Sequence, residues 1–336
     1  MTLTDVPVAA PPLPQARGPL SAAVLAGLRG EGFALPPLTD ADPYGDDLQL
    51  ALYCCYELHY RGFAGVADER EWDPVVLTGR RELERAFLAA LRRDVPAGHD
   101  VAAELDALLV EPVEPAGPSV HLQRHGDVEQ FREYVAQRSL YHLKEADPQA
   151  FVIPRLSGPA KAGLVTVEHD EYGAGRAERM HEHLFARMMV ALDLDPAYGR
   201  YLDATPAPAL AEVTFMSLCG LHRALRGALV GQFAAVELTS SPGSRRLVEG
   251  MQRLGLSADA SEFYAEHVEA DAVHEQLVRR RVLAPLLAAE PALAADVVFG
   301  IRASELLAER FAGHLLESWR QGRSALRTPL HPRSAR

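Results

Sequence analysis

A preference for helix along most of the chain is the feature that most constrains the fold. From Asp46 onward the apolar residues recur with a helical period, and the alternating patterns typical of strands are nearly absent. Pairs such as Asp147 with Pro148 and Gly158 with Pro159, and the run at 241–243, form turn-like separators. The segments expected to be helical are 46–61, 79–94, 99–110, 127–146, 159–193, 209–239, 243–254, 258–289 and 298–319. We therefore predict an all-α bundle.

The chain is predicted to hold one large helical domain between two extensions. Residues 1–40 are rich in Pro and Ala and contain at most one short helix, near Leu20 to Leu28. Residues 41–320 carry the helical periodicity, and residues 321–336 form a basic tail that includes SALRTPLHPRSAR. With 336 residues, of which 48% are hydrophobic, the chain can bury a substantial core without disulfides or structural metals.

The charge balance bears on the class of partner. Lys and Arg number 34 against 46 Asp and Glu, which gives a net charge of −12, and no long basic run occurs. This balance argues against nucleic acid or an anionic membrane as a partner and favours a small-molecule substrate. A homodimer is compatible with the sequence.

The cysteines and the termini bear on the compartment. The chain has three cysteines, and the adjacent pair Cys54 and Cys55 fits neither a disulfide framework nor a zinc motif. The N-terminus lacks the basic and apolar regions of a signal peptide. The apolar stretch 215–238 contains His222, Arg223 and Glu237, which favours a buried helix over a membrane span. We expect a cytoplasmic protein.

Two short motifs place metal-ligating side chains on helix faces. His267, Asp271 and His274 are spaced HxxxDxxH, so all three share one narrow face of a helix. Such a match should arise by chance in roughly 7% of chains of this composition, so it needs a partner motif. Glu171, Glu178 and His181, spaced ExxxxxxExxH in the expected helix 159–193, supply that partner on one helical face.

A further carboxylate, Glu145, stands near the expected end of a helix before Pro148. Bridging carboxylates with a few imidazoles and no thiolate suit paired iron or manganese better than structural zinc. Di-metal bundles place inward-facing acids on several helices. The predicted metal ligands are Glu145, Glu171, Glu178, His181, His267, Asp271 and His274.

Each motif also has a simpler interpretation. The HxxxDxxH face could be an exposed set of His/acid pairs, and Glu178 could face solvent beside an arginine. His142 is a rival for the role of Glu145, although a supporting histidine is more ordinary. Gly227 and Gly231 form GxxxG, which more often marks tight helix packing than a haem site. Other acids and imidazoles, expected to be solvated or supporting groups rather than ligands, are Glu57, His59, Glu168, His169, His183 and Glu275.

Taken together, Glu145 and the two motifs resemble the haem-oxygenase-like diiron oxidases and oxygenases, also called iron-containing redox enzymes. The resemblance covers roughly residues 125–290 and is nearest to the diiron N-oxygenase branch in ligand spacing and order. It implies a haem-oxygenase-like helical fold, two irons assembled from Fe²⁺, and dioxygen as a co-substrate. In N-oxygenase members the equivalent of Glu178 is an extra carboxylate ligand, which several decarboxylase and lyase members lack.

The resemblance leads to one functional expectation and two alternatives. We expect an O₂-dependent oxygenase that oxidises the nitrogen of an amine or guanidine in specialised metabolism, with an external electron donor. No residue beyond the metal ligands is expected to be catalytic. The first alternative is an oxidative decarboxylase or C–C lyase acting on an amino acid or fatty acid. The second is a non-catalytic, metal-binding helical protein.

Overall fold

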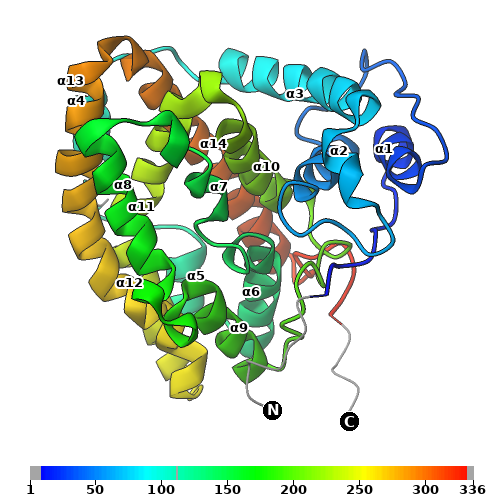
Figure 1. The fold of residues 1–336 in the computed structure, drawn as a ribbon. Helices are drawn as coiled ribbons and strands as arrows, with labels where there is room; N and C mark the ends of the chain where they lie inside the picture. The colour runs from blue at the N-terminus through cyan, green and yellow to red at the C-terminus, as the bar shows by residue number, and fades with distance from the viewer. Residues whose placement is uncertain (1–8, 111–112, 331–336) are drawn as a thin grey trace.

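The computed structural model describes residues 9–110 and 113–330, and for 271–272 the backbone alone. Within these residues the chain is helical and contains no strand, which confirms the predicted all-α class (Figure 1). The α-helices are α1 (Pro19–Arg29), α2 (Asp46–Glu57), α3 (Pro74–Asp94), α4 (Val101–Leu108), α5 (Pro118–Arg124), α6 (Val128–His142), α7 (Asp147–Ala150), α8 (Gly158–Glu171), α9 (His181–Ala191), α10 (Ala207–Leu221), α11 (Arg226–Arg253), α12 (Ala258–Leu277), α13 (Ala284–Ala289) and α14 (Ala294–Arg320). A π-helical segment, Val278–Leu283, joins α12 to α13.

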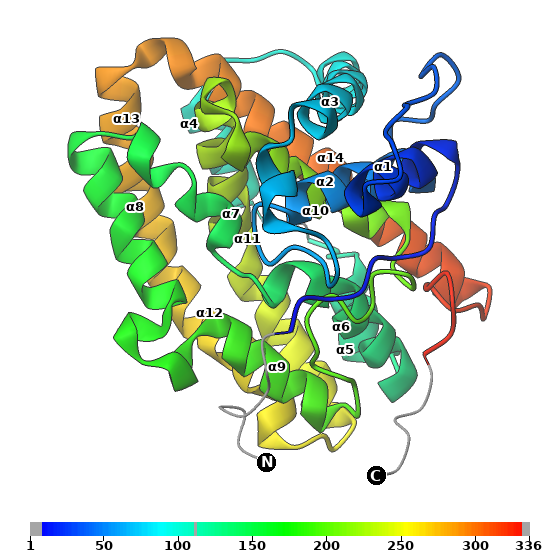
Figure 2. The same cartoon turned by 45° about the vertical axis from the view of Figure 1, so that its right-hand side comes forward.

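Helix α11 is the centre of the bundle. It packs against α12, α14 and α5, and α12 in turn contacts α8 and α9. On the other side, α2 packs against α1, α3 and α10, so that α1 to α3 lie together at one side of the molecule while α8, α12 and α13 lie at the other (Figures 1 and 2). Glu171 ends α8, Glu237 lies on α11, and His267 and His274 lie on α12.

Close backbone contact holds α11 against α14. A Cβ atom added to Gly231 would overlap the carbonyl oxygen of Val297, and one added to Gly300 would overlap that of Ala228. Gly227 meets Asp296 and Leu293 of the same neighbouring segment. The GxxxG pattern therefore marks tight helix packing, because only glycine lets the two backbones approach this closely.

The expected helix 159–193 is wrong as a single element. Helix α8 ends at Glu171, and Gly173, Ala174 and Gly175 follow with φ of 70°, 52° and 80°. Three successive residues in the left-handed region cannot continue a right-handed helix. Two short 3₁₀ turns lead to α9, which begins at His181.

Other boundaries also differ from the sequence prediction. Helix α6 ends at His142 rather than at residue 146, and the short helix α5 forms between the expected helices 99–110 and 127–146. The expected helix 209–239 breaks at His222, which has extended φ/ψ, whereas α11 continues through Pro242. Packing of buried side chains on both sides of Pro242, such as Leu238 and Leu247, offsets the hydrogen bond that proline removes.

The short helix expected near residues 20–28 is present as α1, and its apolar residues are buried against α2. Leu20, Val24, Leu25 and Leu28 belong to the same core cluster as the α2 residues. The division into 1–40, 41–320 and 321–336 stays a prediction, and residues 1–8 and 331–336 lie outside the described residues. None of the described helices is by itself long and apolar enough to cross a bilayer, although a bent pair, 258–289 with 291–320, meets the requirement of length and composition.

The glycine contact between α11 and α14 leads to a stability prediction. Gly231→Ala should lower the free energy of unfolding by about 2 kcal/mol, because the added methyl group forces two helix backbones apart. Gly243→Ala is the matched control in the same helix, since nothing lies within 4 Å of its added Cβ. The control should be neutral or stabilising by up to about 1 kcal/mol. Urea unfolding followed by circular dichroism measures the free energy of unfolding of both variants. Equal values for Gly231→Ala and Gly243→Ala would contradict a close backbone contact at Gly231.

Candidate metal centre

The side chains of the site come mainly from helix ends and from α11 and α12. Glu145 lies in the turn after α6, Glu171 is the last residue of α8, and His181 is the first residue of α9. His267 and His274 lie two turns apart on α12, as their spacing predicted. All five side chains are buried in the interior.

The first group of possible ligands contains Glu145, Glu171, His181 and His267. Each offers one atom within 4.8 Å of the ligand atoms of the others. Glu171 Oε2 lies 2.6 Å from His181 Nδ1, and Glu145 Oε1 lies 3.7 Å from His267 Nε2. His267 Nδ1 donates to the carbonyl oxygen of Phe263 at 2.8 Å, which places the lone pair on Nε2, the nitrogen that faces Glu145.

The second group contains Glu171, Glu237 and His274, again with one atom each within 4.8 Å of the others. His274 Nδ1 lies 3.0 Å from Glu237 Oε2 and 3.5 Å from Glu171 Oε1. Glu171 therefore belongs to both groups, with Oε2 towards His181 and Oε1 towards His274. A carboxylate with this arrangement can bridge two metal ions, which in two-metal sites lie about 3.5–4 Å apart.

The residues present fit a pair of iron ions. Glu145 Oε2 is buried and makes no hydrogen bond within the described part of the chain, and His181 Nδ1 faces the carboxylate of Glu171 at 2.6 Å. A buried polar atom without a partner is costly, and a cation bound beside Glu145 Oε2 removes that cost. The ligand atoms are carboxylate oxygens and imidazole nitrogens without a thiolate, which is the combination that suits iron or manganese.

His142 supports Glu145. Its Nδ1 lies 2.9 Å from Glu145 Oε1, and its ring packs on Phe185 and Phe263. Burial lowers the pKa of His142, which favours the neutral imidazole. Burial opposes ionisation of Glu145, but His142 and His267 together hold its pKa well below the ordinary value. His142 thus orients an ionised carboxylate and belongs to neither group.

Glu178 and Asp271 are the two predicted ligands that remain. Glu178 lies exposed in the 3₁₀ turn Ala177–Arg179, outside both groups. The prediction that it shares a helical face with Glu171 is wrong, because the helix ends at Glu171, and this arrangement lends no support to Glu178 as a ligand. Asp271 lies on α12, but its side chain is outside the described residues, so its role stays a prediction.

Sequence reasoning missed Glu237 and underrated Glu168. In the sequence, Glu237 appears only as a charge that interrupts the apolar stretch 215–238. A single acid among residues that are buried in a helix is the signal that could have identified it as a candidate ligand. Glu168, one turn before Glu171, is 2% exposed, and both its carboxyl oxygens lack a hydrogen-bond partner within the described chain. Burial, with the charges of Glu171 and Glu237, raises the pKa of Glu168 to about 9.

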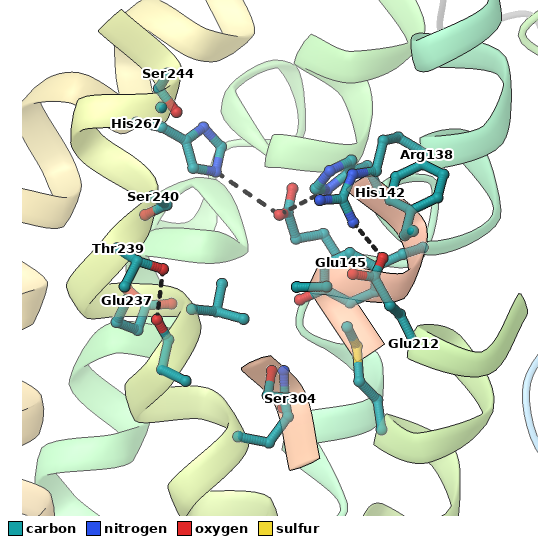
Figure 3. A pocket seen from close by; sticks show the side chains of 18 of the residues that line it. Arg138, His142, Glu145, Glu212, Glu237, Thr239, Ser240, Ser244, His267 and Ser304 are labelled. Atoms are coloured by element: carbon teal, nitrogen blue, oxygen red, sulfur yellow. Dashed lines mark hydrogen bonds and ion pairs between the residues drawn. The ribbon is translucent and has the colours of Figure 1, made fainter. Parts of the chain in front are cut away.

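A cavity of about 380 Å³ opens beside both groups. Glu145, Glu171, Glu237 and His267 line one end, and Figure 3 shows Glu145 and His267 facing each other across it. Its walls are largely apolar and include Phe215, Phe233, Leu307 and Phe311. The size and lining are those of a small-molecule site.

The raised pKa of Glu168 gives a testable effect on the metal-free protein. In the unfolded chain the carboxyl titrates near its ordinary value of 4.5, so between that pH and about 9 the folded state binds one proton more than the unfolded state. Stability should therefore fall as pH rises through this window. Glu168→Gln removes the titration and should raise the free energy of unfolding at pH 7 by about 3 kcal/mol.

Denaturant unfolding between pH 6 and 9 measures the effect, with exposed Glu178→Gln as the control variant. If wild type and Glu168→Gln depend on pH in parallel, Glu168 is not held protonated in the folded protein.

The match to a family model agrees with this chemistry. Residues 132–309 match a haem-oxygenase-type family model described as iron-containing redox enzyme. A domain of unknown function with a haem oxygenase-like fold from Shewanella denitrificans OS217 is similar in structure, with a TM-score of 0.49 and 16% identity over 74% of this chain and 98% of that chain. No curated protein matches the sequence. The family match spans more than half of the chain and all the ligands of both groups, and the chain belongs to the iron-containing redox enzyme family.

Proposed function

We propose that the protein is a diiron, O₂-dependent oxygenase that oxidises the nitrogen of an amine or guanidine substrate. The observation that carries the proposal is the position of Glu171, whose two carboxylate oxygens face histidines of two different ligand groups. A single carboxylate shared in this way supports a pair of ions rather than one ion.

Each residue has a defined part in this proposal. Glu145, His181 and His267 would hold one Fe²⁺, Glu237 and His274 would hold the other, and Glu171 would join them. When bound, the ferrous pair supplies electrons and open positions for dioxygen, and an external donor would be required to restore the ferrous state. The three carboxylates offset most of the charge of two divalent ions, which a buried site requires.

The polar wall of the cavity supports a nitrogenous substrate. Arg138 is the one lysine or arginine among the described lining residues, and its Nη1 donates to Glu212 Oε2 at 2.7 Å (Figure 3). Outside the two ligand groups, the described lining residues include two carboxylates, Glu212 and Glu305 of α14, against the single cation of Arg138. Because Arg138 is paired with Glu212, the charge of Glu305 remains, and it favours a cationic group over a fatty-acid carboxylate.

The Arg138–Glu212 pair lines the cavity with polar atoms. Arg138 donates through Nη1 to Glu212 Oε2 at 2.7 Å and through Nε to the hydroxyl of Tyr134 at 3.4 Å, and the side chains of Arg138 and Glu212 are 27% and 12% exposed. Glu212 Oε1 can accept a hydrogen bond from a substrate ammonium or guanidinium group. The pair would therefore orient a cationic substrate along the cavity that ends at the ligand groups.

The stoichiometry of iron tests the metal part of the proposal. Anaerobic loading with Fe²⁺ should give two ions per chain, with one lost in His267→Ala and one lost in His274→Ala. Glu171→Ala should lower the affinity for both ions, because both groups contain this residue. Exposed Glu178→Ala is the matched control and should retain two. Metal analysis after removal of free ions gives these counts, and wild type that retains no iron contradicts the proposal.

The reaction is tested with oxygen-18 and a panel of alkylamines, alkylguanidines and alkanoic acids. The iron-loaded protein should give a nitrogen-labelled product detected by mass spectrometry. Glu212→Gln should raise KM for that substrate by about 10- to 100-fold with little change in kcat, because a charge-assisted hydrogen bond made in both ground and transition states is lost. Glu305→Gln, which removes a more solvated charge, should have a smaller effect. A chain-shortened product without label on nitrogen would instead favour C–C cleavage.

A further inference from the structure

One guanidinium outside the ligand groups touches two of the segments that carry residues of the first group, those of Glu145 and His181. Arg61 lies just after α2, and its Nη2 donates to the carbonyl oxygen of Leu143 at 3.0 Å and to Glu182 Oε2 at 2.7 Å. Leu143 precedes Glu145 by two residues, and Glu182 directly follows His181. The guanidinium also lies 4.2 Å from the ring centroid of Tyr198, which restricts its position further.

A second anchor from the same end of α2 holds the residue next to Glu145. Lys144 Nζ donates to Glu57 Oε2 at 2.8 Å, and Tyr198 donates its hydroxyl hydrogen to Glu57 Oε1 at 2.7 Å. The side chains of Lys144 and Glu57 are 1% and 0% exposed. The Lys144 ammonium lies 4.0 Å from the ring centroid of Tyr60. A buried ion pair with this geometry holds Lys144 in one place, since either charge alone would be costly.

These anchors matter because Glu145 and His181 are not held by a continuous helix. Helix α6 ends at His142, and Ala146 follows Glu145 with φ of 74°. The chain between Glu171 and His181 passes through three residues with positive φ and two 3₁₀ turns. Local helix geometry therefore does not set the separation of Glu145 and His181, and a tertiary contact must set it.

We propose that the end of α2 belongs to the metal centre and that Arg61 is a positioning residue that sets the separation of Glu145 and His181, with the Glu57–Lys144 pair as a second anchor. The inference rests on the proposed metal centre and gives the N-terminal helices a role in it. The planar guanidinium of Arg61 holds its two acceptors, the Leu143 carbonyl and the Glu182 carboxylate, more firmly relative to each other than a lysine ammonium would.

The chain offers a matched control for Arg61. Arg302 also joins a carboxylate to backbone carbonyls on another segment, since it donates to Glu104 Oε1 at 2.6 Å and to the carbonyl oxygens of Pro96 and Ala97 at 2.9 and 3.1 Å. This bridge ties α14 to α4 and touches neither ligand group. Arg61→Met and Arg302→Met therefore remove equivalent bridges at different places.

The experiment is a Co²⁺ titration against a competing chelator, followed by the visible absorption of bound cobalt. It is performed in wild type and both variants, and repeated in the His274→Ala background so that the ion of the first group is observed alone. Arg61→Met should lower the affinity for that ion by about 10- to 100-fold, the usual loss when a group that orients metal ligands is removed, and should change the cobalt spectrum. Arg302→Met should lower the unfolding temperature without changing the cobalt affinity or the cobalt spectrum.

Glu182→Gln provides a milder second variant, because it keeps Arg61 and weakens only one of its contacts; it should lower the same affinity by a smaller factor. This variant decides the question if circular dichroism shows that Arg61→Met does not fold. Unchanged affinity in folded Arg61→Met, or an equal loss in Arg302→Met, overturns the positioning role while leaving the metal centre intact. If the wild-type protein binds neither cobalt nor iron, both the positioning role of Arg61 and the proposed metal centre are overturned.

Discussion

The carboxylate of Glu171 is the feature on which the arrangement of the site depends. Its oxygens face His181 and His274, and these two histidines come from segments that are far apart in the chain. To bring them to one carboxylate, α8 must end at Glu171 and the chain must return so that α9 can start beside it. The left-handed residues after Glu171 permit this return, at a conformational cost for Ala174, which is not a glycine.

Burial of so many acids requires compensation, and the structure supplies it in different ways. Glu57 and Glu212 are paired with Lys144 and Arg138, each at hydrogen-bond distance. Glu145 has His142 and His267 as neighbours, whereas Glu168 has no hydrogen-bond partner within the described chain and a raised pKa. Compensation is thus least complete at Glu168, one turn before Glu171, in the region where a bound cation would contribute most.

The rest of the bundle can be understood as support for this interior. Close glycine contacts join α11 to α14, and α11 carries Glu237 while α14 forms one wall of the cavity. Helix α2 reaches the opposite side of the site through Arg61 and Glu57.

The sequence by itself determined the helical class, the face that carries His267 and His274, and the carboxylate and imidazole composition of the candidate site. These depend on period and residue type, which are local properties of the chain. It could not determine that α8 breaks after Glu171, since Glu178 and His181 fit a continuous helical face equally well until φ of the intervening residues is known. Nor could it show that Glu237 reaches His274, because helices far apart in the chain meet only after packing. Tertiary structure decided which acids are buried together, and burial is what separates a candidate ligand such as Glu237 from an exposed acid such as Glu178.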